Sequence, residues 1–194
     1  MTAPMHLIFD RPLDAELPKG LDQAIFGMGC YWGVERLFWQ QDGIWLTEVG
    51  FAGGSTDNPT YEQVCAGNTG HAEVVRVVYD SSRISYERLL QLFWENHDPT
   101  QGDRQGNDVG DQYRSVIMHF TDSQRAAAEL SKADFSNRLA VQGFPDITTQ
   151  ILPAARFWPG PEDHQQYLER HPDGYCALRG TGVKAPLTDI AEEF

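Results

Sequence analysis

Residues 23–40 have the sequence Q-A-I-F-G-M-G-C-Y-W-G-V-E-R-L-F-W-Q, and the change of pattern within this stretch decides the fold. Residues 23–26 are typical of a short strand, and the three residues that follow, Gly-Met-Gly, favour a turn. Apolar residues then recur at helical spacing from about residue 30 to residue 40. The pattern therefore predicts a strand that turns into a helix, with Cys30 in the first turn of that helix.

Strands and helices interleave along the rest of the chain. Apolar periodicity and turn residues predict further strands at 44–52, 71–79, 114–120 and 147–152, and further helices at 59–64, 85–96, 122–139 and 162–170. Because no regular repeat of parallel crossovers is visible, the pattern favours an α+β fold. We expect a two-layer sandwich with a mixed, largely antiparallel sheet and a ferredoxin-like core.

Two segments lack a periodic pattern. Residues 97–111 are rich in Gly, Asp, Asn and Gln and form a longer connection than most ordered loops, which indicates either a function or disorder. From residue 172 onward Gly, Pro and small residues dominate, so residues 172–194 are predicted to form an irregular tail that carries Cys176.

The length and the charge balance limit the possible classes of protein. A chain of 194 residues with 41% apolar content can bury one substantial core, so we expect one domain over residues 1–194, with residues 1–22 as an N-terminal extension. Lys and Arg total 15 against 28 Asp and Glu, and the resulting charge of −13 repels nucleic acids and anionic membranes. We expect neither as a partner. Residues 1–21 contain no apolar run typical of a signal peptide, which favours a cytoplasmic location.

The three cysteines, Cys30, Cys65 and Cys176, lie far apart in the sequence, and no C-x-x-C motif occurs. This spacing does not fit a paired disulfide framework, and an odd number leaves at least one free thiol in a monomer. A thiol at a helix N-terminus faces unpaired backbone N–H groups, which favour the thiolate and make Cys30 a candidate nucleophile. The alternative is that Cys30 is a small buried apolar residue, as most free cysteines are. Position alone does not decide between the two.

The residues around Cys30 favour the nucleophile. Gly29 and Gly33 allow other groups to approach the backbone closely, while Tyr31 and Trp32 supply an aromatic wall beside the sulfur. A sulfur that bears a methyl group would fit against such a wall.

The strand predicted at 71–79 places a carboxyl group among valines. Because side chains alternate along a strand, Glu73, Val75, Val77 and Tyr79 share one face. Apolar neighbours and desolvation favour the protonated form of such a carboxyl group.

The sequence G-C-Y-W-G at residues 29–33 resembles the signature of the peptide methionine sulfoxide reductase A family. Further blocks resemble this family in the same order, and together they span residues 25–184. These blocks are Gly53-Gly54, Y-E-Q-V-C-A-G-N-T-G-H-A-E at 61–73, H-D-P-T-Q-G-D-R-Q-G-N-D-V-G-D-Q-Y-R-S at 97–115, F-W-P at 157–159, H-Q-Q-Y-L at 164–168, and G-Y-C with G-T-G-V-K at 174–184. Several long blocks in one order are not a chance match.

The resemblance implies an enzyme, a thiol-dependent peptide-methionine (S)-S-oxide reductase that repairs oxidised proteins. Its substrate would be free or protein-bound methionine sulfoxide, of which an asymmetric site accepts one epimer, the S form. In this family a cysteine attacks the sulfoxide sulfur, and the matching residue is Cys30. The matching acid is Glu73, and the phenols that bind the sulfoxide oxygen match Tyr61 and Tyr113.

The resemblance also implies a substrate-binding set and a relay of thiols. Substrate contacts would come from Tyr31, Trp32 and Asp108. The sulfenic acid formed on Cys30 would condense with Cys176, and thioredoxin would reopen the resulting disulfide. We expect no cofactor, a monomer, and a structural role for the third cysteine, Cys65.

The chain departs from the family pattern at two places. Some members carry another tail cysteine where this chain has Lys184 and Ala185, which favours a relay of two cysteines. Many members have a tyrosine where this chain has Asp163, which leaves the local packing open.

Other functions are weighed against this one. His71 and His97 are too widely spaced from any cysteine to indicate zinc, so we assign no metal. A thiol peroxidase or a general disulfide oxidoreductase would also use a reactive and a resolving cysteine, but the aromatic pair and the Glu73 block argue against both. A module that binds oxidised methionine without turnover would not need Cys30 together with Cys176.

Overall fold

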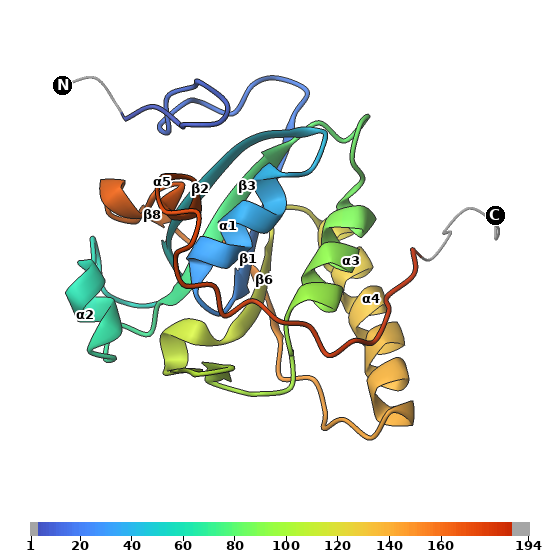
Figure 1. Ribbon diagram of the computed structural model, residues 1–194. Helices are drawn as coiled ribbons and strands as arrows, with labels where there is room; N and C mark the ends of the chain where they lie inside the picture. The colour runs from blue at the N-terminus through green and yellow to red at the C-terminus, as the bar shows by residue number, and fades with distance from the viewer. Residues whose placement is uncertain (1–3, 188–194) are drawn as a thin grey trace.

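A six-stranded sheet with the order β7-β6-β1-β3-β2-β8 forms the centre of the computed structural model, which describes residues 4–187 (Figure 1). The strands are β1 (Asp22–Met28), β2 (Ile44–Ala52), β3 (Ala72–Tyr79), β6 (Ser115–His119), β7 (Gln150–Pro153) and β8 (Trp158–Pro159). Every neighbouring pair is antiparallel except β6 and β7, which are parallel. The predicted α+β class with a mixed, largely antiparallel sheet is therefore confirmed.

Three helices cover one face of this sheet (Figure 1): α1 (Tyr31–Trp39), α3 (Tyr86–Asn96) and α4 (Asp122–Val141). Two of them begin at hydroxyl caps, because Ser85 accepts the N–H of Arg88 and Thr121 accepts the N–H of Gln124. The short helix α2 (Tyr61–Cys65) begins with a capping box between Thr60 and Gln63. The main helices were thus predicted to within a few residues.

The core between the helices and the sheet is aromatic. Phe26 in β1 is fully buried, and its ring centroid lies 5.1 Å from that of Phe38 in α1 and 5.7 Å from that of Phe93 in α3. On β3, Val75 and Val77 face the same core, as the alternation predicted. This packing fixes α1, and with it Cys30, against the middle of the sheet.

The opposite face of the sheet carries a smaller apolar cluster and no long helix among the described residues. Ile25, Val74 and Val116 pack there against Leu152 and Phe157. At the end of the sheet Leu13, from the N-terminal extension, packs against β2 and β3. Residues 1–3 of the predicted extension and residues 188–194 of the predicted tail lie outside the described residues.

The polar segment at 97–111 is ordered, which settles the choice left open by the sequence. It contains a two-stranded hairpin, β4 (Arg104–Gln105) with β5 (Asp108–Val109), followed by a 3-10 turn, η1 (Asp111–Tyr113). The buried amide of Gln105 donates to the Asp98 carbonyl at 2.9 Å and accepts the Asp98 N–H at 3.1 Å. One side chain thus closes the loop as a backbone partner would.

The prediction of one helix over 162–170 was wrong. The segment is a 3-10 turn, η2 (Glu162–His164), and a separate helix, α5 (Tyr167–Arg170). Between them Gln166 has a left-handed backbone with φ 48°, which interrupts a helix. Strand β8 was not predicted because two residues are too few to show a period of two, and β7 begins three residues later than predicted, at Gln150.

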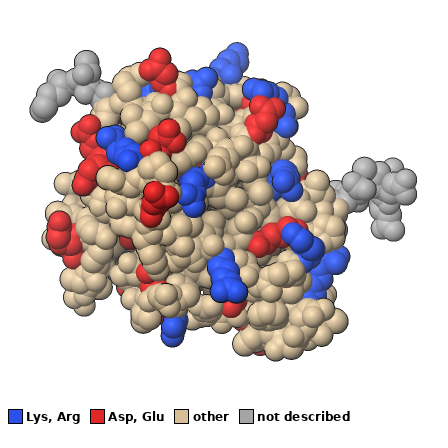
Figure 2. Space-filling model, in the orientation of Figure 1, with Lys and Arg blue, Asp and Glu red and all other residues tan. Residues whose placement is uncertain are grey.

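Acidic and basic side chains are interspersed over the face shown in Figure 2, with wide uncharged areas between them. Neither sign of charge gathers into one continuous patch on this face. Within residues 4–187 no helix combines the length and the apolar character needed to cross a membrane.

The aromatic core gives a stability prediction. Replacement of Phe26 by Ala removes a fully buried ring from the centre of the Phe38 and Phe93 cluster. We expect the free energy of unfolding to fall by about 3–5 kcal/mol, measured by urea denaturation. The matched control is Val141→Ala at an 83% exposed position, which should change the free energy by less than about 0.5 kcal/mol. A Phe26→Ala protein as stable as the wild type would contradict this description of the core.

Candidate active site

Cys30 lies at the start of α1, where a glycine turn delivers it. Gly29 has φ 95°, and a β-carbon at this position would lie 2.6 Å from Cβ of Gln105, so both the backbone and the close packing require glycine. Cys30 follows as the N-cap of α1 and is partly exposed. The thiol is therefore held beside the helix N-terminus and remains accessible.

Glu73 lies under the first turn of α1. It is only 2% exposed, and its Oε2 accepts the backbone N–H of Tyr31 at 3.1 Å. This N–H is one of the groups at a helix N-terminus that have no partner within the helix. The carboxyl group therefore joins the start of β3 to the residue that follows Cys30.

Burial changes the protonation of this carboxyl group. The pKa of Glu73 is raised to about 8, mainly by desolvation and also by the nearby Asp108, although the hydrogen bond from the N–H of Tyr31 acts in the opposite direction. Glu73 is therefore mostly protonated at neutral pH and can donate a proton.

The expectation that the helix N-terminus holds Cys30 as a thiolate was wrong for the free protein. Desolvation raises the pKa of the Cys30 thiol far above its usual value, and the charges of Glu73 and Asp108 raise it further. A backbone hydrogen bond from Trp32 lowers the pKa but does not compensate. The sequence predicts that Cys30 lies at a helix start. It does not reveal the groups that oppose ionisation of the Cys30 thiol, because these come from distant segments of the chain.

Two phenols come to this site from separate segments. Tyr61 is the first residue of α2 and Tyr113 ends η1, and both are partly exposed. Desolvation raises the pKa of each phenol, and the charge of Glu73 adds to the effect. Both hydroxyls therefore remain neutral hydrogen-bond donors beside the acid.

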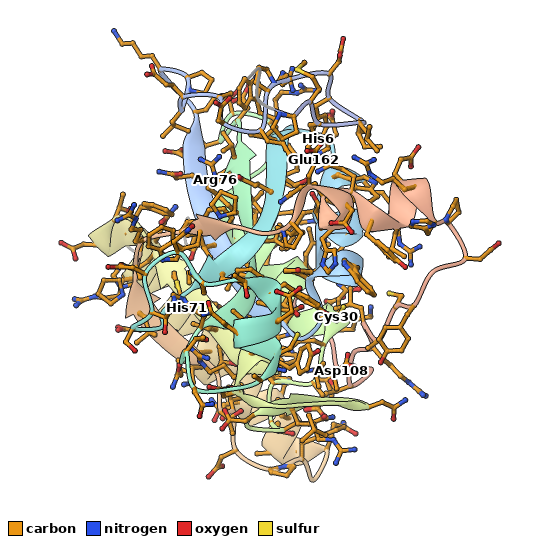
Figure 3. The ribbon with its side chains drawn as sticks, turned by 90° about the vertical axis from the view of Figure 1, so that its left-hand side faces the viewer. His6, Cys30, His71, Arg76, Asp108 and Glu162 are labelled. Atoms are coloured by element: carbon orange, nitrogen blue, oxygen red, sulfur yellow. The ribbon has the colours of Figure 1, made fainter. Side chains whose placement is uncertain are left out.

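Asp108 lies on β5 of the hairpin, on the same side of the molecule as Cys30 (Figure 3). Its Oδ1 accepts the hydroxyl of Tyr175 at 3.1 Å, while Oδ2 is buried and has no hydrogen-bond partner within residues 4–187. Burial raises the pKa of Asp108. One oxygen of this residue thus remains free to accept a donor.

The aromatic residues after Cys30 form a group around His164. Trp32 stacks on Tyr167 with ring centroids 3.9 Å apart, and both Trp32 and Tyr61 meet the edge of the His164 ring. The hydroxyl of Tyr31 bonds to Nδ1 of His164 at 2.7 Å. Because Tyr31 is only 1% exposed, the wall that faces solvent comes mainly from Trp32.

His164 and Tyr167 are site residues that the sequence analysis did not identify, although it quoted the H-Q-Q-Y-L block that contains them. The two residues between them explain their placement. The amide of Gln165 accepts the N–H of Val49 at 2.9 Å and donates to its carbonyl at 2.8 Å. Gln166 donates its N–H and its side-chain amide to the fully buried Glu35, each at 2.7 Å.

Cys176 and Cys65 are both exposed free thiols. Cys176 lies in the segment after α5, which runs across the front of α1 and α3 (Figure 1). Cys65 ends α2 beside the hydroxyl of Tyr61. Of the two departures noted in the sequence, Lys184 pairs with Glu95 at 3.0 Å, and Asp163 is an exposed residue next to His164 in η2.

The two histidines considered as metal ligands bond to the surrounding polypeptide. His71 accepts the N–H of Gly54 at 3.1 Å and donates to the carbonyl of Thr56 at 2.8 Å. His97 bonds to the carbonyl of Phe93 and to the hydroxyl of Ser115. Among residues 4–187 no three His, Cys, Asp or Glu side chains are grouped to hold a metal ion.

The candidate catalytic and substrate-binding residues thus gather around Cys30 and Glu73. An accessible thiol beside a protonated acid and neutral donors, with a second thiol in reach of the same helix, defines the site of a thiol-based oxidoreductase.

Comparisons with known proteins agree with this class. A family model described as peptide methionine sulfoxide reductase matches residues 22–191. Peptide methionine sulfoxide reductase MsrA of Rhodospirillum centenum is 56% identical over 190 residues, which cover 97% of this chain and 87% of that protein. Methionine sulfoxide reductase A of Corynebacterium diphtheriae has a similar structure, with a TM-score of 0.81 and 38% identity over 97% of this chain and 91% of that one. Mxr1 of Saccharomyces cerevisiae, solved in complex with Trx2, shares the fold, with a TM-score of 0.54 and 20% identity over 91% of this chain and 96% of that one.

The chain therefore belongs to the peptide methionine sulfoxide reductase family. The motif-based prediction of the family and of a methionine sulfoxide reductase enzyme is confirmed.

The raised pKa of Glu73 predicts how stability depends on pH. A carboxyl whose folded pKa is about 8 and whose unfolded pKa is near 4.5 binds its proton more tightly in the folded state. The contribution of Glu73 to the free energy of unfolding is complete below the unfolded pKa. It falls by at most about 1.4 kcal/mol per pH unit between the unfolded and the folded pKa, and it levels off above the folded pKa. The measurement is the free energy of unfolding of the wild type minus that of Glu73→Gln, from pH 5 to pH 9.

The matched control is Glu62→Gln, which replaces an exposed glutamate on α2 whose pKa is lowered. Its difference from the wild type should not change over the same range. A constant difference for Glu73→Gln as well would show that Glu73 is ionised throughout.

Proposed function

We propose that this protein reduces the S epimer of methionine sulfoxide at Cys30, with Glu73 as the acid. The observation that carries the proposal is the protonated, 2% exposed carboxyl of Glu73 at the helix start that bears the thiol. Tyr61 and Tyr113 donate hydrogen bonds to the sulfoxide oxygen, and Trp32 with the ring of Tyr31 borders the methyl group. One hand of the sulfoxide fits a pocket with its oxygen donors on one side and its apolar wall on another.

The reaction transfers one oxygen atom. The Cys30 sulfur attacks the sulfoxide sulfur as Glu73 gives its proton to the sulfoxide oxygen. This attack joins the two sulfur atoms. The protonated oxygen then moves from the substrate sulfur to the Cys30 sulfur: an S–O bond to Cys30 forms, the S–O bond to the substrate and the S–S bond break, and methionine leaves with Cys30 as a sulfenic acid. The thiol proton returns to Glu73, so no proton is gained or lost overall. Asp108, with one unpartnered oxygen, positions the substrate backbone.

The oxidised cysteine is then resolved by the second thiol. We infer that Cys176 displaces hydroxide from the Cys30 sulfenic acid, which forms a disulfide and water. A dithiol donor, thioredoxin, reopens this disulfide by exchange. Two facts support the inference: Cys176 is exposed to an external donor, and Mxr1 of Saccharomyces cerevisiae has been solved in complex with Trx2. Cys65 has a structural role in this scheme.

We also propose a ferredoxin-like core, one domain, a monomeric state and a cytoplasmic location. The order β6-β1-β3-β2, with α1 and α3 as the two crossovers, supports the ferredoxin-like arrangement. A single large core cluster that includes residues from β1, α1, α3 and α4 supports one domain. Substrates are free or protein-bound methionine sulfoxide, as repair of oxidised proteins requires.

The role of Glu73 is tested by single-turnover kinetics with the S epimer. Glu73→Gln should form methionine about 10²–10⁴-fold more slowly than the wild type because an amide supplies no proton. In the wild type the rate constant should fall as pH rises through about 8, where Glu73 loses its proton. The control Glu62→Gln should match the wild type, and Cys30→Ser should form no methionine.

Two outcomes would contradict this function. Equal rates for the R and S epimers would remove the proposed stereochemistry, and faster consumption of hydrogen peroxide than of sulfoxide would favour a peroxidase. An unaltered rate in Glu73→Gln would assign the acid to another group.

The relay is tested by counting thiols after one turnover without a reductant. We expect two of the three thiols to disappear per methionine formed, and mass spectrometry should place the disulfide between Cys30 and Cys176. Cys65→Ser should leave this result unchanged. A disulfide that contains Cys65 would instead assign the resolving role to that residue.

A further inference from the structure

The segment that carries Cys176 packs directly on Gly33. A β-carbon at Gly33 would lie 2.6 Å from Sγ of Cys176 and 3.2 Å from Cβ of Leu178, so any side chain at this position would overlap the tail. Gly33 lies inside α1, and its φ is outside the left-handed region. Glycine weakens a helix interior relative to alanine, so backbone conformation gives no reason for it here. The position instead requires glycine because the Cys176 segment occupies the space that a side chain would fill.

This space lies next to the nucleophile. Gly33 follows Cys30 by three positions, and residues three apart lie on the same side of a helix. The Cys176 sulfur therefore lies against the first turn of the helix that Cys30 caps. Consistent with this placement, Cys176 contributes to the raised pKa of the Cys30 thiol.

Contacts on both sides hold the segment in place. Just before Cys176 the hydroxyl of Tyr175 donates to Asp108, and just after it Leu178 packs against the main core cluster. Further along, Glu95 accepts the N–H of Ala185 at 2.9 Å and the ammonium of Lys184 at 3.0 Å. These contacts on both sides of Cys176 thus hold its exposed thiol over Gly33.

We propose that Gly33 is a positioning residue for disulfide formation. Because Gly33 has no side chain, it leaves a space that holds the Cys176 thiol close to the sulfenic acid that forms on Cys30. The inference rests on the proposed relay. When the sulfenic acid forms, the Cys176 sulfur bonds to the Cys30 sulfur, the S–O bond breaks, and the oxygen leaves as water with the thiol proton. Both electrons come from Cys176, so the step needs no further reductant or oxidant.

The test is Gly33→Ala in a single turnover with the S epimer and no reductant. The variant should still form one methionine per enzyme, whereas the Cys30–Cys176 disulfide should form at least tenfold more slowly than in the wild type. The sulfenic acid should therefore accumulate and be trapped by the 1,3-diketone dimedone, which mass spectrometry detects on Cys30. Iodoacetamide should also modify the displaced Cys176 faster, with Cys65 as an internal control of unchanged rate.

A double variant separates positioning from a general disturbance of α1. Cys176→Ser already lacks the resolving thiol, so adding Gly33→Ala to it should not lengthen the lifetime of the sulfenic acid further. Leu178→Ala removes a contact that holds the Cys176 segment over Gly33 and leaves the sequence of α1 unchanged, so it should also slow formation of the disulfide. It also keeps the proposal testable if Gly33→Ala does not fold.

Three results would overturn the proposal. The first is disulfide formation at the wild-type rate in Gly33→Ala, or in Leu178→Ala if Gly33→Ala does not fold. The second is a longer lifetime of the sulfenic acid in the double variant than in Cys176→Ser, and the third is loss of the methionine burst in folded Gly33→Ala. Failure of the underlying relay looks different. In that case Cys176→Ser would still form a disulfide at Cys30, whatever residue stands at position 33.

Discussion

The hydrogen bond from the Tyr31 N–H to the Glu73 carboxyl is the interaction on which the site depends. β3 is fixed between β1 and β2, so Glu73 has little freedom, and the first turn of α1 is held to it at 3.1 Å. If the two moved apart, a buried N–H and a buried carboxyl oxygen would each lose a partner, at a cost of about 1–3 kcal/mol per group. The same bond therefore sets the position of the acid and that of the neighbouring Cys30.

A second set of buried polar groups holds the far wall of the site. Gln165 bonds to both backbone groups of Val49 in β2, and Gln166 bonds to Glu35 in α1. Because two adjacent side chains point into the fold, the residues on either side of them, His164 and Tyr167, point toward Trp32. The left-handed backbone at Gln166 is part of this arrangement, and the Glu35 carboxyl that accepts both of its N–H groups stabilises it.

The sequence predicted those parts of the protein that local patterns encode. Alternation placed Glu73 with Val75 on the core face of a strand, and the glycine turn placed Cys30 at a helix start; both are confirmed. The motif blocks identified the family from the types of residue that they contain, but they gave no information on the surroundings of those residues in the fold. The raised pKa of the Cys30 thiol depends on Glu73 and Asp108, which come from other segments. Likewise, the break at Gln166 depends on a distant carboxylate, which no helical periodicity in the 162–170 segment reveals.

The correction at Cys30 changes how the site controls its chemistry. The thiolate is the form that attacks peroxide and other oxidants, and burial that raises the pKa of the Cys30 thiol lowers the fraction of thiolate. In the proposed reaction, a sulfoxide presents an oxygen that Glu73 protonates and also a methyl group that lies beside Trp32, which hydrogen peroxide lacks. By this proposal the sulfoxide becomes reactive when Glu73 protonates it inside the site, and the Glu73 carboxylate that results accepts the thiol proton of Cys30. In the proposed mechanism, selectivity for the sulfoxide thus follows from two neutral groups that exchange protons during the reaction, rather than from a nucleophile that is ionised beforehand.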